Sequence, residues 1–325
     1  MLSDPRPATA DPDDRAAART RASGDVDEWT VVVPTRGDVA GAARIEENIV
    51  KRLDGVPVMV VRNGGCGERL ARRPGVEILD VPGGGVARAR NAALAAATTR
   101  TVVFVDDDVI VSGAALRTLV ARQREAGAAI ATARVRPADA AHHGLFDDAL
   151  GFDRGSTSRA WRLGTEADEP MSPLNAWKFG VGATVAVDRA LLGDAVRFDE
   201  RLSNGRFCGG SEDVDFIYAA YLACHTVCYV ADAVVEHLFP LPAPAVSAKC
   251  RQYALSDGAF YAKWARRVSA SDLRGEVTGW WDRIAKWRAD RAAGRPAIPL
   301  PDLLAEPLYK LVGGVTWALV LRRSS

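Results

Sequence analysis

Three consecutive aspartates, Asp106, Asp107 and Asp108, directly follow the apolar run TVVFV at residues 101–105. Adjacent carboxylates repel one another, so they cost stability unless a cation or a basic group neutralises them. Carboxylate oxygens suit Mg²⁺ or Mn²⁺, and such a metal often bridges one or two carboxylates to the phosphates of a substrate. The triplet therefore predicts a divalent-metal site. The alternative is a turn in which Asp107 or Asp108 is a cap and the other carboxylates are solvated.

A second acidic pair, Glu212 and Asp213, follows Gly209, Gly210 and Ser211 at the start of a helix predicted over residues 214–223. Serine is a favoured helix cap, and acids in the first turn are stabilised by the helix dipole, so this pattern needs no catalytic explanation. The glycines, however, would let the helix start approach a substrate closely. The pair is thus either an ordinary helix start or a pair of carboxylates that faces a ligand.

The elements that must position these acids are short β-branched strands alternating with Ala-rich helices. Continuous apolar runs suit strands buried on both faces of a mainly parallel sheet. In such sheets, ligands collect at the carboxyl ends of the strands, where the connecting loops meet. We predict strands at 30–33, 56–61, 76–79 and 101–105, with crossover helices at 40–53 and 86–97.

The ends of the chain differ in composition from this α/β part. Residues 1–27 are rich in Ala, Asp, Arg and Pro and lack the apolar run of a secretory signal, so they are expected to be a disordered leader. Residues 28–240 are expected to form the α/β domain. Residues 241–325 are expected to form a helical extension, with helices at 245–267, 272–292 and 303–321.

Charge and cysteine usage exclude some classes of partner. The 42 basic and 41 acidic residues give a formal charge of +1, so no overall field would recruit nucleic acid. Five cysteines and no signal peptide indicate a cytoplasmic protein. The apolar stretch 308–321 is shorter than the roughly 20 residues of a spanning helix. Packing or partner contact, including a homodimer, is favoured for it over peripheral contact with a membrane.

Seven motifs occur in a characteristic order, and together they resemble glycosyltransferase family 2 on a GT-A fold, a Rossmann-like sheet flanked by helices. The resemblance spans roughly residues 29–240, and it implies inverting transfer of a sugar from a nucleotide diphosphate donor with the help of Mn²⁺ or Mg²⁺. The motifs are VVVPTRG, VRNGG, GVARARNAAL, VVFVDDDV, FGVGATVAVDRALL, GGSEDVDF and VVEH.

By this resemblance, the donor side of the site includes the residues after the first strands, the Ala-Arg-Asn segment and the first two aspartates. The family's Asp-x-Asp metal motif maps onto Asp106 and Asp108, with Asp108 the implied direct metal ligand and Asp106 nearer the ribose, and His237 completes the metal or diphosphate site. Without the resemblance, a lone histidine at a strand end is more often a surface or capped residue. The implied nucleotide-binding residues are Pro34, Thr35, Arg36, Asn63, Arg90, Asp106 and Asp107. The family usually carries an acidic residue near Asn63, where this chain has Arg62 before it and Gly65-Cys66 after it.

The resemblance also places catalysis and the acceptor. Asp213 is the implied general base, and Glu212 orients it or the acceptor. Trp177, with Gly180 and Gly182, is a candidate for acceptor binding, because glycines allow close approach and an indole stacks on flat apolar faces. An ordinary packed aromatic at a strand start is an equal alternative. Residues 138–175, without a clear period, are expected to form a long acceptor loop.

Two other functions compete with this hypothesis. A nucleotidyltransferase that forms nucleotide sugars would share the sheet and the metal, but it would carry a Gly-rich basic signature after the first strand. A non-catalytic relative would bind a nucleotide or scaffold another enzyme, although both acidic pairs are retained here. UDP is the expected nucleotide, with GDP or dTDP as fallback. The acceptor is expected to be a sugar, a lipid-linked molecule or a natural product.

Overall fold

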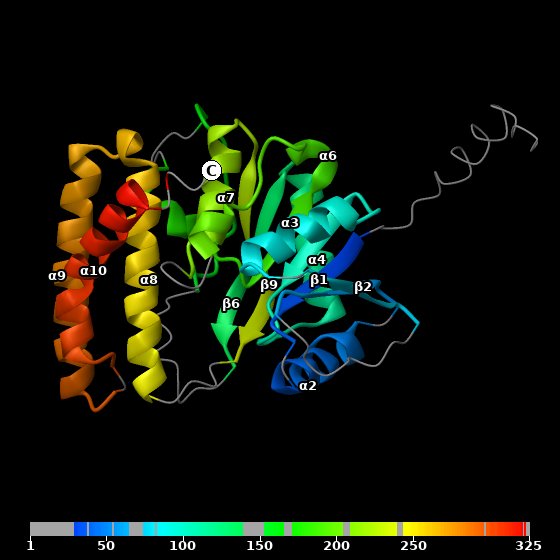
Figure 1. Cartoon of the computed structure of the whole chain (residues 1–325), viewed down its shortest axis with the longest axis horizontal. Helices are drawn as coiled ribbons and strands as arrows, with labels where there is room; N and C mark the ends of the chain where they lie inside the picture. The colour runs from blue at the N-terminus through cyan, green and yellow to red at the C-terminus, as the bar shows by residue number, and fades with distance from the viewer. Residues whose placement is uncertain are drawn as a thin grey trace, which may run out of the picture.

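The computed structural model describes residues 29–37, 39–53, 55–64, 74–81, 83–138, 153–165, 171–203, 209–238, 243–295, 297–320 and 322 (Figure 1). The expected leader, Cys66 and half of the expected acceptor loop lie outside these residues. In the described part, a mixed sheet with helices on both faces adjoins a group of C-terminal helices.

The centre of the protein is a nine-stranded sheet of order β3-β2-β1-β4-β8-β6-β9-β5, with β7 paired to β9. The strands β3, β2, β1 and β4 run parallel, whereas β8 runs antiparallel to both β4 and β6. The four predicted strands are confirmed, three of them with shifted ends and the strand at 101–105 with the predicted ends. The strand bounds are β1 Trp29–Thr35, β2 Val58–Arg62, β3 Val76–Asp80, β4 Thr101–Val105, β5 Val109–Ile110, β6 Ile130–Pro137, β7 Arg159–Trp161, β8 Thr184–Asp188 and β9 Val227–His237.

Alternating side chains of these strands build one core on each face of the sheet. Val31 and Val33 of β1 pack in the core that includes helices α2 (Val39–Asn48) and α4 (Gly113–Glu125). Val32 lies in the opposite core, which includes α3 (Val86–Ala96) and α7 (Glu212–Leu222). Because both faces are covered, the strands read as continuous apolar runs, as the sequence predicts.

The pairing of β5 with β9 brings distant acidic and basic motifs together. Val109 of β5 is in register with His237 at the end of β9. In addition, the Leu238 N–H donates to the carbonyl oxygen of Asp108 at 2.8 Å. The end of β9 therefore lies beside the aspartate triplet, even though more than a hundred residues separate them.

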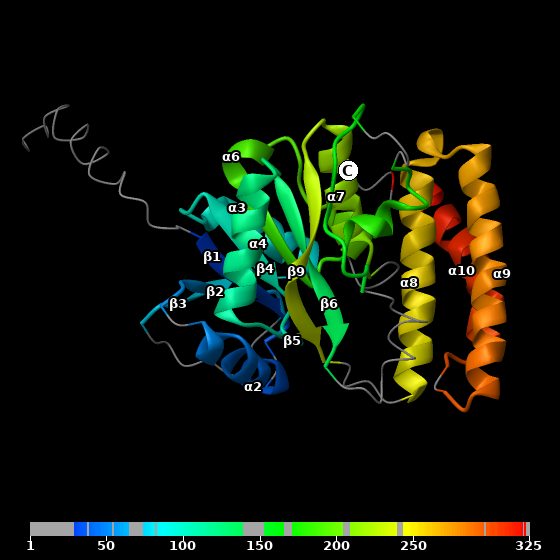
Figure 2. The ribbon, with the colours of Figure 1, turned by 180° about the vertical axis from the view of Figure 1, so that it is seen from behind.

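Three long helices, α8 (Ala243–Lys263), α9 (Ala270–Ala292) and α10 (Leu300–Leu319), stand together beside the sheet, with α8 nearest to it (Figures 1 and 2). Helices α8 and α10 approach closely: a Cβ on Gly258 would overlap the carbonyl oxygen of Lys310, and one on Gly313 would overlap that of Leu255. Among the described residues, no helix is both long and apolar enough to cross a membrane.

Candidate active site

A buried arginine joins the two acidic motifs. Arg90 of α3 donates from Nη2 to Asp106 Oδ1 and from Nη1 to Glu212 Oε1, each at 2.8 Å. Only 3% of its side chain is exposed. Burial opposes its charge, but Asp106 and Glu212 leave the pKa of Arg90 raised. One cation therefore fixes a carboxylate after β4 and a carboxylate at the start of α7.

The two carboxylates that Arg90 holds are themselves perturbed. Burial raises the pKa of Asp106, although Arg90 opposes this effect. Burial, together with the charge of Asp213, raises the pKa of Glu212 to about 7. Glu212 Oε2 is buried and has no hydrogen-bond partner among the residues that the structure describes. This oxygen is available to a polar group of a ligand.

Asp213, the residue after Glu212, is fixed by a backbone amide. The Gly182 N–H donates to Asp213 Oδ2 at 2.5 Å. A Cβ at position 182 would lie 2.5 Å from Asp213 Cβ and 2.7 Å from its Oδ2, so only glycine permits this approach. Gly182 and Asp213, both predicted as site residues, are thus in direct contact.

Asp108 and His237 form a second contact of the predicted metal set. Their Oδ1 and Nε2 atoms are 3.4 Å apart, with the Asp108 side chain partly exposed. Asp106 is directed to Arg90, and within the described ranges no three His, Cys, Asp or Glu side chains form a metal-ligand group. A carboxylate and an imidazole nevertheless match the donor set that Mn²⁺ accepts when substrate phosphates supply further oxygens. The metal assignment stays a prediction.

The side chain of Asp107 contacts different residues from those that the side chains of Asp106 and Asp108 contact. Thr35 Oγ1 donates to Asp107 Oδ2 at 2.6 Å, and Arg44 of α2 lies 3.8 Å from its other carboxylate oxygen. The Asn63 N–H donates to the Thr35 carbonyl oxygen at 3.0 Å. The ends of β1, β2 and β4, including Pro34 within β1, are thereby joined at one edge of the sheet. Predicted residues Thr35, Asn63 and Asp107 come together there.

Arg36 and Arg62 lie at the same edge. Arg36 is exposed, and a Cβ on Gly64 would overlap its carbonyl oxygen. Arg62 pairs with Asp80 at the end of β3 through two hydrogen bonds of 2.6 Å. This ion pair between the ends of β2 and β3 is a contact that the sequence did not predict.

The predicted acceptor residues occupy a segment before β8. Trp177 is 44% exposed, and the Arg154 guanidinium carbon lies 4.6 Å from the centre of its ring. Burial lowers the pKa of Arg154 to about 10. Gly180 has a φ of 114° and packs against Thr132. Both the backbone conformation and the close packing require glycine at this position. Lys178 Nζ also lies 5.8 Å from the centre of this ring, so two cations flank the partly exposed indole.

Helix α8 shapes the loop that precedes α7, a role that the sequence did not predict. The Gly209 N–H donates to Ser256 Oγ and the Ser211 hydroxyl to Asp257 Oδ1, each at 2.8 Å. Ser211 has a left-handed φ of 67° and forms no side-chain cap on α7, contrary to the capping interpretation. Tyr253 packs against Gly210. Burial, followed by the charges of Asp213 and Asp108, raises the pKa of Tyr253 well above its usual value.

A charged network ties the end of α8 to α7 behind the site. Lys263 Nζ lies 2.7 Å from Asp215 Oδ2 and 2.8 Å from Asp199 Oδ2, and Trp264 Nε1 donates to Asp215 at 2.8 Å. Burial works against the charge of Asp199, but Arg201 and Lys263 lower its pKa to about 2. The third acid of the GGSEDVDF motif therefore anchors α7 and does not face the site.

Comparison with known proteins identifies the family. The sequence model described as glycosyltransferase like family 2 matches residues 25–253, which is more than half of the chain. The chain belongs to this family. As a member of glycosyltransferase-like family 2, it is an enzyme of the glycosyltransferase type. Among curated protein sequences, none matches it.

Solved structures agree on the fold. A mannosyltransferase from Pyrobaculum calidifontis, solved with GDP-Man and Mn²⁺, is similar with a TM-score of 0.56 and 18% identity, over 94% of this chain and 93% of that one. TarS residues 1–349 from S. aureus in complex with UDP are similar with a TM-score of 0.48 and 17% identity, over 92% of both chains. The predicted GT-A fold with a C-terminal helical part is confirmed.

Proposed function

We propose that this family 2 enzyme transfers a glycosyl group, with inversion, from a nucleoside diphosphate sugar to an acceptor hydroxyl. The observation that carries the proposal is the fixed carboxylate of Asp213, held by the Gly182 N–H at 2.5 Å beside the Arg90–Asp106–Glu212 cluster. A base must be held in a defined orientation to take a proton from an attacking hydroxyl. This arrangement supplies that orientation at the carboxyl edge of the sheet.

In the proposed reaction, the acceptor oxygen attacks the anomeric carbon from the face opposite the diphosphate. The new carbon–oxygen bond forms as the bond to the diphosphate breaks, and the electron pair leaves with the phosphate. Asp213 accepts the acceptor proton through the oxygen that does not bind Gly182, so no covalent intermediate with the enzyme is needed. Glu212 Oε2 accepts a hydrogen bond from a substrate hydroxyl.

Asp108 and His237 would hold the divalent metal, with phosphate oxygens of the donor completing its coordination. A metal bound there would neutralise the charge that develops on the leaving diphosphate. Asp106, partly exposed beside Arg90, would accept a hydrogen bond from the donor ribose. Arg90 itself is buried and already paired, so we propose that it orients these carboxylates and does not contact the nucleotide.

The donor nucleotide is proposed to be UDP or GDP. UDP is the expectation from the family, whereas the similar mannosyltransferase was solved with GDP-Man and Mn²⁺, which favours a manganese-dependent guanine donor. Titration calorimetry of the full chain with UDP, GDP and dTDP, each with and without Mn²⁺, tests this choice. Binding of one nucleotide that depends on Mn²⁺ supports the site, and no binding of any of them contradicts it.

Two variants separate the proposed metal ligand from the proposed base. Asp108→Ala is expected to abolish the Mn²⁺-dependent part of nucleotide binding, because it removes a carboxylate ligand. Asp213→Asn is expected to leave nucleotide binding nearly unchanged and to lower kcat by a factor of about 10² to 10⁴, as for loss of a general base. Full activity of Asp213→Asn would refute the base assignment. A product with retained anomeric configuration in NMR spectra would refute inversion.

A further inference from the structure

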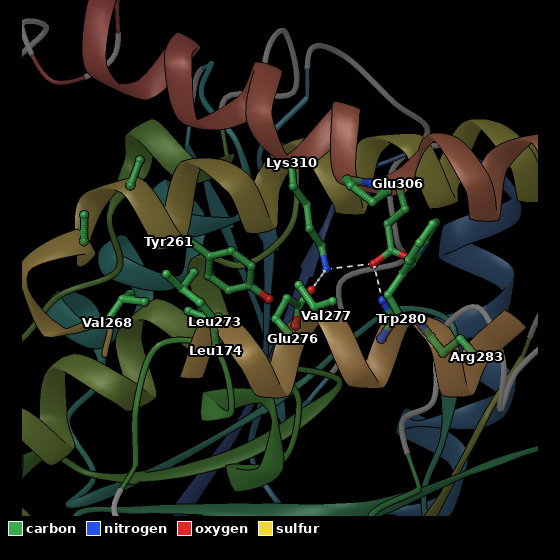
Figure 3. Close-up of a pocket in the computed structure, with 13 residues that line it drawn as sticks. Leu174, Tyr261, Val268, Leu273, Glu276, Val277, Trp280, Arg283, Glu306 and Lys310 are labelled. Atoms are coloured by element: carbon green, nitrogen blue, oxygen red, sulfur yellow. Dashed lines mark hydrogen bonds and ion pairs between the residues drawn. The ribbon is translucent and has the colours of Figure 1, made fainter. Parts of the chain in front are cut away.

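A cavity of about 510 Å³ lies among the three C-terminal helices, away from the proposed base (Figure 3). Its walls come from the end of α8, from α9, from the middle of α10 and from Leu174 in the segment before β8. Most of the lining is apolar, including Leu174, Tyr261, Val268, Leu273, Val277 and Trp280. Leu273 and Val277 are also more than half exposed, so apolar side chains surround the opening.

The cavity exists because α9 is held apart from the other two helices. Glycines let α8 and α10 pack backbone against backbone, whereas long side chains connect α9 to α10. The Trp280 Nε1–H donates to the Leu303 carbonyl oxygen at 2.9 Å, and Arg283 contacts Glu306 at 2.8 Å. These long side chains keep α9 at a distance from α10. Among the described residues, no side chain fills the space between the helices.

The charged groups at the cavity already neutralise one another. Lys310 pairs with Glu276 of α9 and, at 2.7 Å, with Glu306 of its own helix, while Arg283 pairs with Glu306 (Figure 3). Two cations thus balance two carboxylates, so no net charge is available for a charged occupant. An uncharged hydrocarbon fits these walls best.

The outward face of α10 is also apolar, which inverts the usual pattern of a surface helix. Its charged residues Asp302, Glu306 and Lys310, spaced four apart, all turn inward to Arg251, Arg283 and Glu276. The outward residues are roughly half exposed or more and comprise Leu304, Leu308, Leu311, Val312, Val315 and Leu319. Exposed Trp281 extends the apolar surface onto α9.

We infer that α9 and α10 lie on a lipid bilayer surface and that the cavity takes the hydrocarbon chain of a bilayer lipid. The outward stripe of α10 is wider than a coiled-coil seam, and its flanks (Pro301, Ala305, Tyr309, Thr316 and Ala318) carry no charge. If a helix from a second copy packed on this stripe, charged residues would be expected at the positions that flank it. Such a helix would also leave the cavity empty. An amphipathic helix at a membrane interface buries its apolar face at the headgroup boundary and keeps its charged face away from the lipid, which is the division between the two faces of α10. This inference goes beyond the proposed transfer reaction and does not depend on it.

Flotation of the full chain with phosphatidylcholine vesicles, and with mixed phosphatidylcholine and phosphatidylglycerol vesicles, tests the surface. The double variant Leu308→Gln, Leu311→Gln is expected to lower the bound fraction at least tenfold, because it places two amides in hydrocarbon. Leu191→Gln, an exposed leucine on the short helix α6 (Arg189–Leu192), is the matched control and is expected to bind as the unmodified chain does.

The cavity is tested separately by filling it. Val277→Phe at the opening is expected to reduce the quenching of tryptophan fluorescence by vesicles whose acyl chains carry bromine, because the larger side chain fills the cavity without adding a tryptophan. Thr278→Phe, one residue further along α9 and exposed, is expected to leave this quenching unchanged. Circular dichroism confirms that each variant is folded. Equal quenching of the two variants would overturn the cavity assignment. Absence of vesicle binding by the unmodified chain would overturn the surface assignment, as would a dimer in light scattering that the double variant dissociates.

Discussion

The buried carboxyl of Glu212 should make the stability of the protein depend on pH in a defined way. Its side chain is 6% exposed, and burial together with Asp213 raises its pKa to about 7 from an ordinary value of 4.5. At about 1.4 kcal/mol per pKa unit, this difference corresponds to about 3 kcal/mol. Because the pKa is raised in the folded state, the contribution is fully present below pH 4.5 and is lost as the pH rises through about 7.

The variant Glu212→Gln keeps the shape of the protonated side chain but cannot ionise. It is expected to match the unmodified protein near pH 4.5 and to become more stable than it by about 3 kcal/mol near pH 8. The measurement is the free energy of unfolding in urea at several pH values, without nucleotide or metal. Glu77→Gln, on the exposed side of β3, is the control for general effects of removing a carboxylate. A difference between Glu212→Gln and the unmodified protein that stays constant with pH would refute the reasoning.

Two further predictions concern the groups that hold the acids. Gly182→Ala would place a Cβ 2.7 Å from Asp213 Oδ2 and displace that carboxylate, so kcat is expected to fall by about tenfold or more while calorimetric nucleotide binding stays unchanged. Weakened nucleotide binding in this variant would contradict the separate placement of donor and base. Arg90→Met leaves Asp106 and Glu212 without their cation, so the free energy of unfolding in urea is expected to fall by about 3 to 5 kcal/mol. A decrease in the free energy of unfolding of less than about 1 kcal/mol would show that Asp106 and Glu212 do not need the Arg90 cation.

The fold could be predicted from the sequence because strands and helices are indicated by local runs of residues. The strands of the parallel part are runs of β-branched residues, and Thr101–Val105 begins and ends where the apolar run does. Helix α3 also begins at Val86, as predicted. Order and spacing of the motifs then identified the family, which no single motif could have done.

The contacts between residues of the site could not be predicted from the sequence in the same way. Arg90 and Glu212 are 122 positions apart, so no local pattern indicates that they pair. Ser211 has the sequence signature of a helix cap, yet its hydroxyl bonds Asp257 of a distant helix. The roles of α8 depend on tertiary packing, which overrides local preference and leaves no spacing to recognise.

The hydrogen bonds from α8 to the loop before α7 have a consequence for building chimeric enzymes. The family match ends at residue 253, in the middle of α8, whereas Ser256, Asp257 and Lys263 hold the loop and α7 from beyond that point. An exchange of C-terminal segments joined at the end of the match would discard these supports. A junction at Val268–Ser269, between α8 and the capped start of α9, would retain them. Helix α8 therefore belongs to the catalytic unit, although α10 packs closely against it.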